Sequence, residues 1–99
     1  MTKEEVLDLL KNVYDPEIGL DIVNLGLIYR IDISDDGKSI SIDMTLTSIG
    51  CPIGPTLINM VEEVLKSKFE NVNVNVVFDP PWNPEMISDE GKQALGIFY

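Results

Sequence analysis

The stretch LIYRIDISDDGKSISIDMTL, residues 27–46, alternates apolar and polar side chains in two runs on either side of a turn. The apolar positions are Leu27, Tyr29, Ile31 and Ile33 in the first run, and Ile40, Ile42, Met44 and Leu46 in the second. An alternation with a period of two is typical of a strand with one buried face, and an Asp-Gly turn between two such runs is typical of a hairpin. We therefore predict a β-hairpin in the first half of the chain.

Helices are expected before and after this hairpin in the sequence. Thr2 and Glu5 have the spacing of a capping box, and apolar residues at helical spacing follow, so a helix is predicted over residues 3–13, ending before Asp15-Pro16. Residues 15–26 show no single period and are interpreted as a loop with at most one helical turn near Ile22. The segment 48–55 is rich in Gly and Pro, and a second helix is predicted to start near residues 53–55 and to end near Lys68.

A third strand is predicted over residues 72–78, because valines there alternate with asparagines. The prolines of residues 79–84 end it, and Ser88 can cap a last short helix that ends near Gly96. The order α-β-β-α-β-α predicts an α/β (α+β) two-layer sandwich with helices on one face of a three-stranded sheet. The order of the strands does not follow from the pattern. Residues 1–99 are expected to form a single domain.

The composition excludes several classes of protein. The chain has 99 residues, of which 44% are hydrophobic, and 7 Lys and Arg face 17 Asp and Glu, a net charge of −10. A field of this sign repels nucleic acid and anionic lipid. There is no histidine, which excludes imidazole-based catalysis and histidine-ligated metal sites. The first residues do not resemble a signal peptide, and no apolar run is long enough for a membrane span, so a cytoplasmic location is expected.

Cys51 is the first candidate for chemistry, because it is the only cysteine and lies just before the second predicted helix. A helix N-terminus favours the thiolate, whereas nearby carboxylates oppose it, so the residues alone leave the state of the thiol open. A lone cysteine is also often a small buried hydrophobic residue. It cannot form an internal disulfide or a zinc site by itself.

Two further groups of residues could contribute to a site. Asp15, Glu17 and Asp21 form an acidic cluster that could meet a hard cation or the lysines of a partner, although solvated carboxylates explain the same pattern. Thr45 and Thr47 are predicted on the opposite face of their strand from Met44 and Leu46, where a hydroxyl could bind a ligand or simply reflect β-propensity.

Pro81 and Trp82 belong to a stiff segment that holds the only tryptophan of the chain. This segment is a candidate partner-binding surface, and the alternative is that the tryptophan covers the core.

Taken together, several ordered stretches resemble the small metal-sulfur cluster biosynthesis proteins of the SufT and PaaD types. The stretches are residues 15–18 (DPEI), 21–29 (DIVNLGLIY), 44–52 (MTLTSIGCP), 79–82 (DPPW) and 95–96 (LG). The resemblance implies an iron-sulfur assembly-type domain, a cytoplasmic role in cluster maturation, and a functional patch. The patch would comprise Asp15, Glu17, Thr47 and Cys51, with Ile18 and Thr45 beside them.

The resemblance implies a carrier or an adaptor between the iron-sulfur assembly machinery and client apoproteins, and not an enzyme. Because a cluster is usually held by four thiolates and this chain has one, no tightly bound cofactor is expected. A transient cluster with Cys51 as one ligand is compatible with this limit, as is a homodimer that brings two thiolates together.

Two other functions compete with this hypothesis. The first is a thiol-dependent enzyme with Cys51 as nucleophile, which would need a carboxylate as base because histidine is absent. The second is a nucleic-acid module of the KH type, which has a similar order of elements. The spacing of Gly50 and Gly54 differs from Gly-x-x-Gly, and the charge has the wrong sign.

Overall fold

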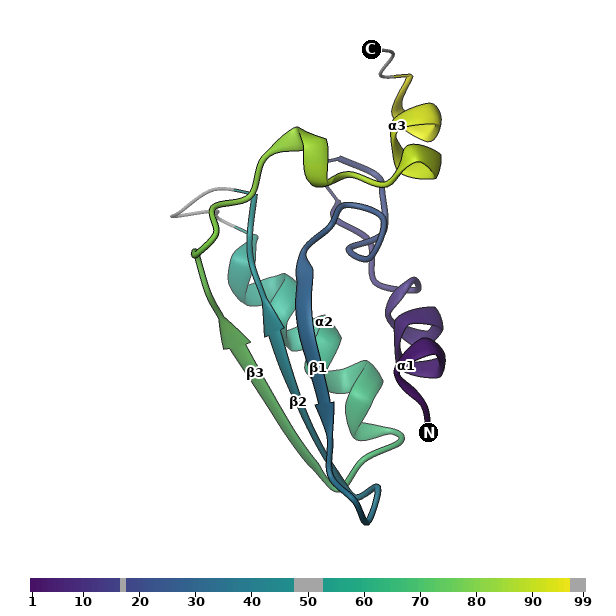
Figure 1. Ribbon diagram of the computed structural model, residues 1–99, viewed down its shortest axis with the longest axis vertical. Helices are drawn as coiled ribbons and strands as arrows, with labels where there is room; N and C mark the ends of the chain where they lie inside the picture. Colours follow the sequence, from purple (N-terminus) through teal and green to yellow (C-terminus); the bar gives the residue numbers. More distant parts are fainter. Residues whose placement is uncertain (17, 48–52, 97–99) are drawn as a thin grey trace.

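The computed structural model describes residues 1–16, 18–47 and 53–96, which form a layer of helices packed against a three-stranded sheet (Figure 1). The α-β-β-α-β-α order predicted from the sequence is confirmed, with one additional 3-10 turn, η1. The elements are α1 (Lys3–Leu10), β1 (Ile28–Ile33), β2 (Ser39–Met44), α2 (Gly54–Lys66), β3 (Asn71–Val76), η1 (Pro84–Met86) and α3 (Asp89–Leu95).

The sheet has the order β1-β2-β3, which the sequence did not reveal. β1 and β2 pair antiparallel as the predicted hairpin, and β2 pairs parallel with β3. Parallel neighbours cannot be joined by a tight turn, so the chain returns through α2 between them. The end of β2 and the beginning of α2 are therefore at the same end of the sheet, opposite the hairpin turn (Figure 1).

The core lies between the sheet and the helices α1 and α2. Ile40, Ile42 and Met44 of β2 are buried, as the alternation predicts, and they face a helix whose buried residues recur every three or four positions. The buried helical residues are Val6 and Leu10 in α1, and Leu57, Val61 and Leu65 in α2. The predicted two-layer α+β sandwich is thus confirmed.

The other face of the sheet is polar. Asparagine side chains of β3 donate to side-chain oxygens of β2 at each successive outward position: Asn71 to Ser39 (3.2 Å), Asn73 to Ser41 (3.4 Å) and Asn75 to Asp43 (3.1 Å). These pairs follow the parallel register, so the repeated Asn-Val pattern gives β3 one amide-lined face and one apolar face.

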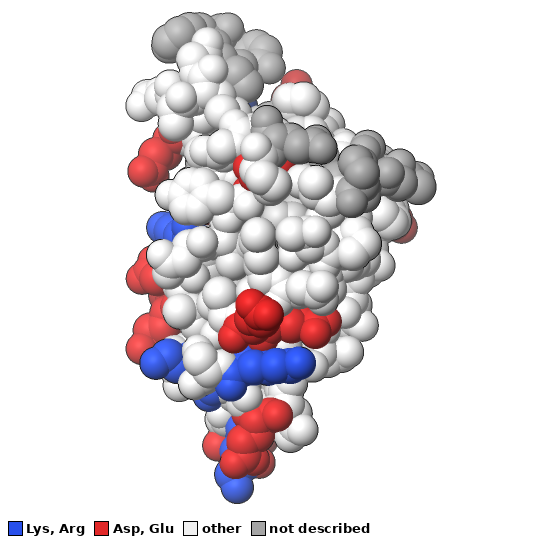
Figure 2. All heavy atoms as spheres, turned by 180° about the vertical axis from the view of Figure 1, so that it is seen from behind, with Lys and Arg blue, Asp and Glu red and all other residues white. Residues whose placement is uncertain are grey.

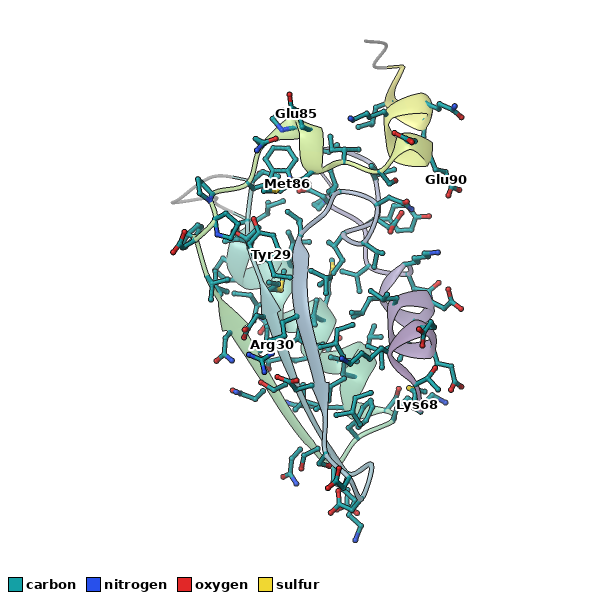
Figure 3. All side chains as sticks on the ribbon, viewed as in Figure 1. Tyr29, Arg30, Lys68, Glu85, Met86 and Glu90 are labelled. Carbon is teal, nitrogen blue, oxygen red and sulfur yellow. The ribbon has the colours of Figure 1, made fainter. Side chains whose placement is uncertain are left out.

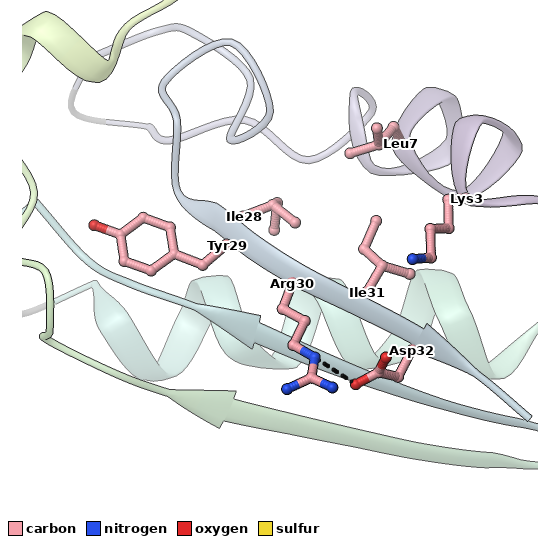
Figure 4. A pocket seen from close by; sticks show the side chains of 7 residues that line it. All are labelled: Lys3, Leu7, Ile28, Tyr29, Arg30, Ile31 and Asp32. Atoms are coloured by element: carbon pink, nitrogen blue, oxygen red, sulfur yellow. Dashed lines mark ion pairs between the residues drawn. The ribbon is translucent and has the colours of Figure 1, made fainter.

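The alternation in β1 is wrong at Tyr29. A bulge lies between Ile28 and Arg30, so that Ile28 pairs with buried Met44 and takes the core-facing position. Ile28 and Ile31 project to the same side of the strand in Figure 4, toward α1. The Tyr29 hydroxyl instead donates to the Pro80 carbonyl oxygen at 2.8 Å, which a period of two could not foresee.

The first helix ends three residues earlier than predicted. Beyond Leu10 the backbone bonds tighten to three-residue spacing, with Asn12 N donating to Leu9 O and Val13 N to Leu10 O. The Val13 carbonyl then accepts from Ile22 N at 3.0 Å, which draws the chain out of the helix. The loop that follows contains the helical turn expected near Ile22, closed by Leu25 N donating to Asp21 O.

The predicted helix caps are present. Thr2 and Glu5 form both bonds of a capping box, and the pKa of Glu5 is lowered chiefly because its carboxylate accepts from the Thr2 backbone N–H. The Ser88 hydroxyl accepts from Gly91 N at the start of α3, and Gly96 ends that helix in the left-handed conformation.

The C-terminal segment after β3 is tied back to the loop before β1. Trp82 Nε1 donates to Leu25 O at 2.7 Å, and the Ser88 hydroxyl donates to Asn24 Oδ1 at 2.6 Å. Between these two bonds, Gly26 lies directly against the backbone of Met86, and a Cβ atom at this position would clash with the Met86 carbonyl oxygen. Figure 3 shows Met86 above Tyr29 at this end of β1.

We predict that Gly26→Ala destabilises the protein far more than Gly37→Ala. Both glycines have a positive φ, of 79° and 71°, which costs an L-residue about 1 to 2 kcal/mol. A Cβ at Gly37 meets nothing within 4 Å, whereas at Gly26 it meets Met86. Urea unfolding should give a loss of about 1 kcal/mol for Gly37→Ala and of at least about 3 kcal/mol for Gly26→Ala. Equal losses would mean that the contact with Met86 is not rigid.

Candidate functional site

The candidate site residues that the structure describes, Asp15, Ile18, Thr45 and Thr47, lie toward the end of the sheet where β2 and β3 finish. The loop of residues 11–27, the end of β2 and the start of α2 are gathered there (Figure 1). In an open sheet the carboxyl ends of parallel strands are a common place for ligand sites. The fold therefore brings the predicted segments to one end of the molecule.

A relay of backbone hydrogen bonds holds the loop against β2. Val13 O accepts from Ile22 N (3.0 Å), Ile22 O accepts from Leu27 N (3.1 Å), and Leu27 O accepts from Thr45 N (2.8 Å). The residues around Asp15 and those around Thr45 are joined through the backbone by this relay, although they are about thirty positions apart in the chain.

Asp15 shapes a turn. It is only 2% exposed, its N–H donates to Leu20 O at 3.0 Å, and its Oδ1 accepts from Ile18 N at 3.3 Å. A short carboxylate that accepts from a nearby backbone N–H is a turn-forming device. Ile18 is half-buried and packs against the core, so these two patch residues do lie together.

Asp21 is also buried, and its carboxylate is occupied. Asn24 donates to both oxygens, from its backbone N at 3.0 Å and from Nδ2 at 2.7 Å. The acidic cluster is therefore not a set of solvated carboxylates at Asp15 and Asp21. Within residues 1–16, 18–47 and 53–96, no three Cys, Asp or Glu side chains form a group that could hold a metal ion. Glu17 lies outside the described residues.

Thr45 differs from its predicted environment. It comes directly after β2, is fully buried, and its Oγ1 has no hydrogen-bond partner among the residues that the structure describes. A buried hydroxyl without a partner costs about 1 to 3 kcal/mol relative to a solvated one. Thr47 is half-buried. An unsatisfied polar atom in a small core is rare enough to require an explanation, and here it lies beside the candidate site.

The residues that flank the segment containing Cys51 are described by the structure. Cys51 itself lies outside the described residues. On either side of residues 48–52, Leu46 and Gly54 are in contact, because a Cβ at Gly54 would come within 2.8 Å of Leu46 Cδ1. The entrance to α2 has Pro55 in its first turn and no acidic residue there. The strand exit and the helix entrance are thus fixed next to each other.

The partner-binding candidates occupy two environments. Pro81 is exposed, whereas Trp82 is half-buried against the core and its one polar atom donates inward to Leu25 O. Trp82 therefore covers the core, which is the alternative considered from the sequence. A binding role for either residue stays a prediction.

Sequence reasoning missed the long-range contacts that hold this end together, chiefly those of Asn24, Gly26, Tyr29 and Ser88. Their partners lie 51 to 64 positions away along the chain. A local sequence pattern cannot identify these distant partners. Each of the four residues also fits its local role in a loop, a strand or a helix cap, so nothing in the pattern marks it.

Known proteins resemble this chain over most of its length. A family model described as "Iron-sulfur cluster assembly protein" matches residues 3–77. A relative from Staphylococcus aureus (strain USA300), named Fe-S protein maturation auxiliary factor SufT, is 48% identical and covers 86% of this chain and 98% of its own length. The factor YitW of Bacillus subtilis (strain 168), with the same description, is 43% identical over 96% and 94%.

Solved structures agree in fold. A domain of unknown function from Bacillus anthracis superposes with a TM-score of 0.89 at 40% identity, covering 97% of this chain and 92% of that one. A conserved hypothetical protein from Thermotoga maritima gives a TM-score of 0.81 at 44% identity, covering 97% and 95%.

We predict that Thr45→Val raises the free energy of unfolding by about 1 kcal/mol, because it replaces an unpaired buried hydroxyl with a methyl group of the same shape. Thr47→Val is the control, and should change it by less than about 0.5 kcal/mol because that side chain is only half-buried. Urea unfolding followed by circular dichroism measures both. A clear destabilisation by Thr45→Val would show that the hydroxyl has a partner in solution.

Proposed function

The chain belongs to the family of iron-sulfur cluster assembly proteins, and on this premise we propose that it is a non-catalytic maturation factor for iron-sulfur proteins. It would either carry a cluster transiently or connect the assembly machinery with client apoproteins. One observation carries the proposal: the family match over residues 3–77 includes every residue of the predicted patch, from Asp15 to Cys51.

The ligand count favours hand-over rather than storage. A cluster is usually held by four thiolates, and this chain has one cysteine and no histidine. Cys51 could supply one ligand to a cluster that is cargo, while the remaining ligands come from a small thiol, a second chain or the receiving protein. Incomplete ligation makes the cargo easy to release, which suits a carrier.

The two threonines of the proposed patch could act as hydrogen-bond donors. A hydroxyl O–H can donate to a thiolate or to a cluster sulfur, and the buried Thr45 hydroxyl has no partner within residues 1–16, 18–47 and 53–96. We therefore include Thr45 and Thr47 in the proposed patch as donors. Asp15 contributes by fixing the turn that presents Pro16 and Ile18. Glu17 remains in the patch on the strength of the family resemblance.

The face over α2 offers a neutral surface for a protein partner. Figure 2 shows that Lys, Arg, Asp and Glu gather toward the edges and the lower end of this face, that some acidic atoms are visible in its upper part, and that its middle is uncharged. The charged residues of α2 all lie in its second half: Glu62, Glu63 and Lys66. Because the chain carries ten net negative charges, an uncharged area next to the site lowers the electrostatic cost of contact with an acidic client.

The remaining features agree with an accessory protein. The relatives from Staphylococcus aureus and Bacillus subtilis are named auxiliary factors, and neither name supports the alternative of a thiol enzyme. None of the helices in the described ranges is long and apolar enough to cross a membrane. We propose a cytoplasmic location, where a single cysteine stays reduced.

Cys51→Ser is expected to leave the fold intact and to abolish cluster-dependent activation of client proteins in cells. Ser67→Ala, a substitution at the opposite end of α2, is the matched control and should leave activation unchanged. Normal client activity in cells that carry only the Cys51→Ser protein would exclude a role for the thiol.

Anaerobic reconstitution with iron and sulfide separates the two forms of the proposal. If the protein is a carrier, visible absorption bands of a thiolate-bound cluster appear in the wild type and are lost in Cys51→Ser. If neither protein shows these bands while the substitution still abolishes client activation, the adaptor form is correct.

A further inference from the structure

The open edge of β1 borders a groove. Residues of α1 and β1 enclose about 460 Å³, a volume within the range of about 300 to 1,000 Å³ typical of ligand pockets. The lining residues are Lys3 and Leu7 from α1, and Ile28, Tyr29, Arg30, Ile31 and Asp32 from β1 (Figure 4). None of the candidate site residues lines this groove, which lies along the open edge of β1.

One wall of the groove carries unused backbone groups. Ser34 N donates to Ser39 O at 3.0 Å, so Ser34 and Asp32 direct their backbone groups toward β2. Alternation then directs the N–H and C=O groups of Ile31 and Ile33 away from β2. Within the described part of the chain no strand pairs with this side of β1. An extended segment could therefore add to the sheet here.

The opposite wall is built from one side of α1. Val6 and Leu10 point into the core, whereas Lys3 and Leu7, one turn apart, project over β1 (Figure 4). Leu7 is half-buried and packs against the core beside Ile28, which gives the groove an apolar floor. A helix facing an open strand edge is the arrangement in which domains such as PDZ bind extended peptides.

The charges of the groove are positive in sum. Arg30 and Asp32 neutralise each other in an ion pair of 2.8 Å, drawn as a dashed line in Figure 4. Lys3 forms no ion pair with any carboxylate of the described residues, although the chain has 17 acidic residues against 7 basic ones. An unpaired ammonium group above an apolar floor favours an occupant with a negative charge.

We propose that this groove binds an extended segment of a partner protein, which adds to the open edge of β1 as a fourth strand. Its backbone would bond with Ile31 and Ile33, its inward side chains would be β-branched or other apolar residues that contact Leu7 and Ile28, and an Asp or Glu side chain would pair with Lys3. The proposal does not require a cluster, so it can fail or hold independently of the proposed function.

The test is a titration of isotope-labelled protein with a blocked peptide, acetyl-Thr-Val-Thr-Val-Thr-Glu-Thr-amide, in which the valines and the Glu share one face of the strand, followed by amide chemical shifts. Saturable shifts are expected at Ile31, Ile33 and the first turn of α1. Replacing the Glu of the peptide with Gln, or Lys3 with Ala, should weaken binding by about tenfold, the size expected for the loss of one charge-assisted hydrogen bond. Lys3→Arg should keep most of the affinity.

Lys11→Ala is the matched control, because Lys11 also belongs to the α1 region but pairs with Asp8 outside the groove. It should bind like the wild type, and so should Cys51→Ser. Absence of saturable binding, shifts confined to β3, the other open edge of the sheet, or an affinity unaffected by Lys3→Ala would each overturn the proposal. A peptide with Gln in place of Glu and with a free C-terminal carboxylate is a further test. If it binds as tightly as the Glu peptide, Lys3 pairs with a chain terminus, and the proposed pairing of Lys3 with an acidic side chain is overturned.

Discussion

The parallel pairing of β2 with β3 is the constraint on which the position of the candidate site depends. Two parallel neighbours require a crossover, so the chain must leave β2, enter α2 at the same end and run back along the sheet. Leu46 and Gly54 fix the two sides of this crossover by direct contact. The two ends of this crossover are thereby held at the end of the sheet where the loop from Val13 to Leu27 also lies, and Cys51 falls between them in the sequence.

A second set of contacts closes this end from the other side. The C-terminal segment crosses the loop and is held by bonds from Trp82, Ser88 and Tyr29, with Gly26 pressed against Met86. Thr45, whose N–H donates to Leu27 O at this end, is fully buried, and its hydroxyl has no partner among the described residues. A protein selected only for stability would place an apolar residue at this position, and a polar atom left unsatisfied in a core calls for an explanation, of which a functional role is one. The energetic penalty at Thr45 is therefore an independent reason to look for function at this end of the molecule.

The helices, strands and caps, which depend on residues close together in the chain, could be predicted from the sequence. The contacts between distant segments could not. Capping residues such as Thr2 and Ser88 act on backbone groups a few positions away, so the helix ends they mark could be predicted. The bulge at Tyr29 and the burial of Asp15 and Thr45 depend on segments distant in sequence. A local alternation of period two cannot predict contacts with such segments. For the site, Asp15 and Ile18 share one turn and the threonines lie at the end of β2, while Glu17 and Cys51 rest on sequence resemblance alone.

The distribution of charge connects the two proposed surfaces. Ten net negative charges repel most acidic cellular proteins, so specific partners must be met where this repulsion is locally weak or reversed. Such places include the uncharged area over the first half of α2, next to the candidate site, and the groove beneath Lys3. They are built from different elements, α2 in one case and α1 with β1 in the other. A partner strand along β1 would therefore leave the end of β2 open, and a client could be held by the groove while the residues around Thr45 and Thr47 receive or release their cargo.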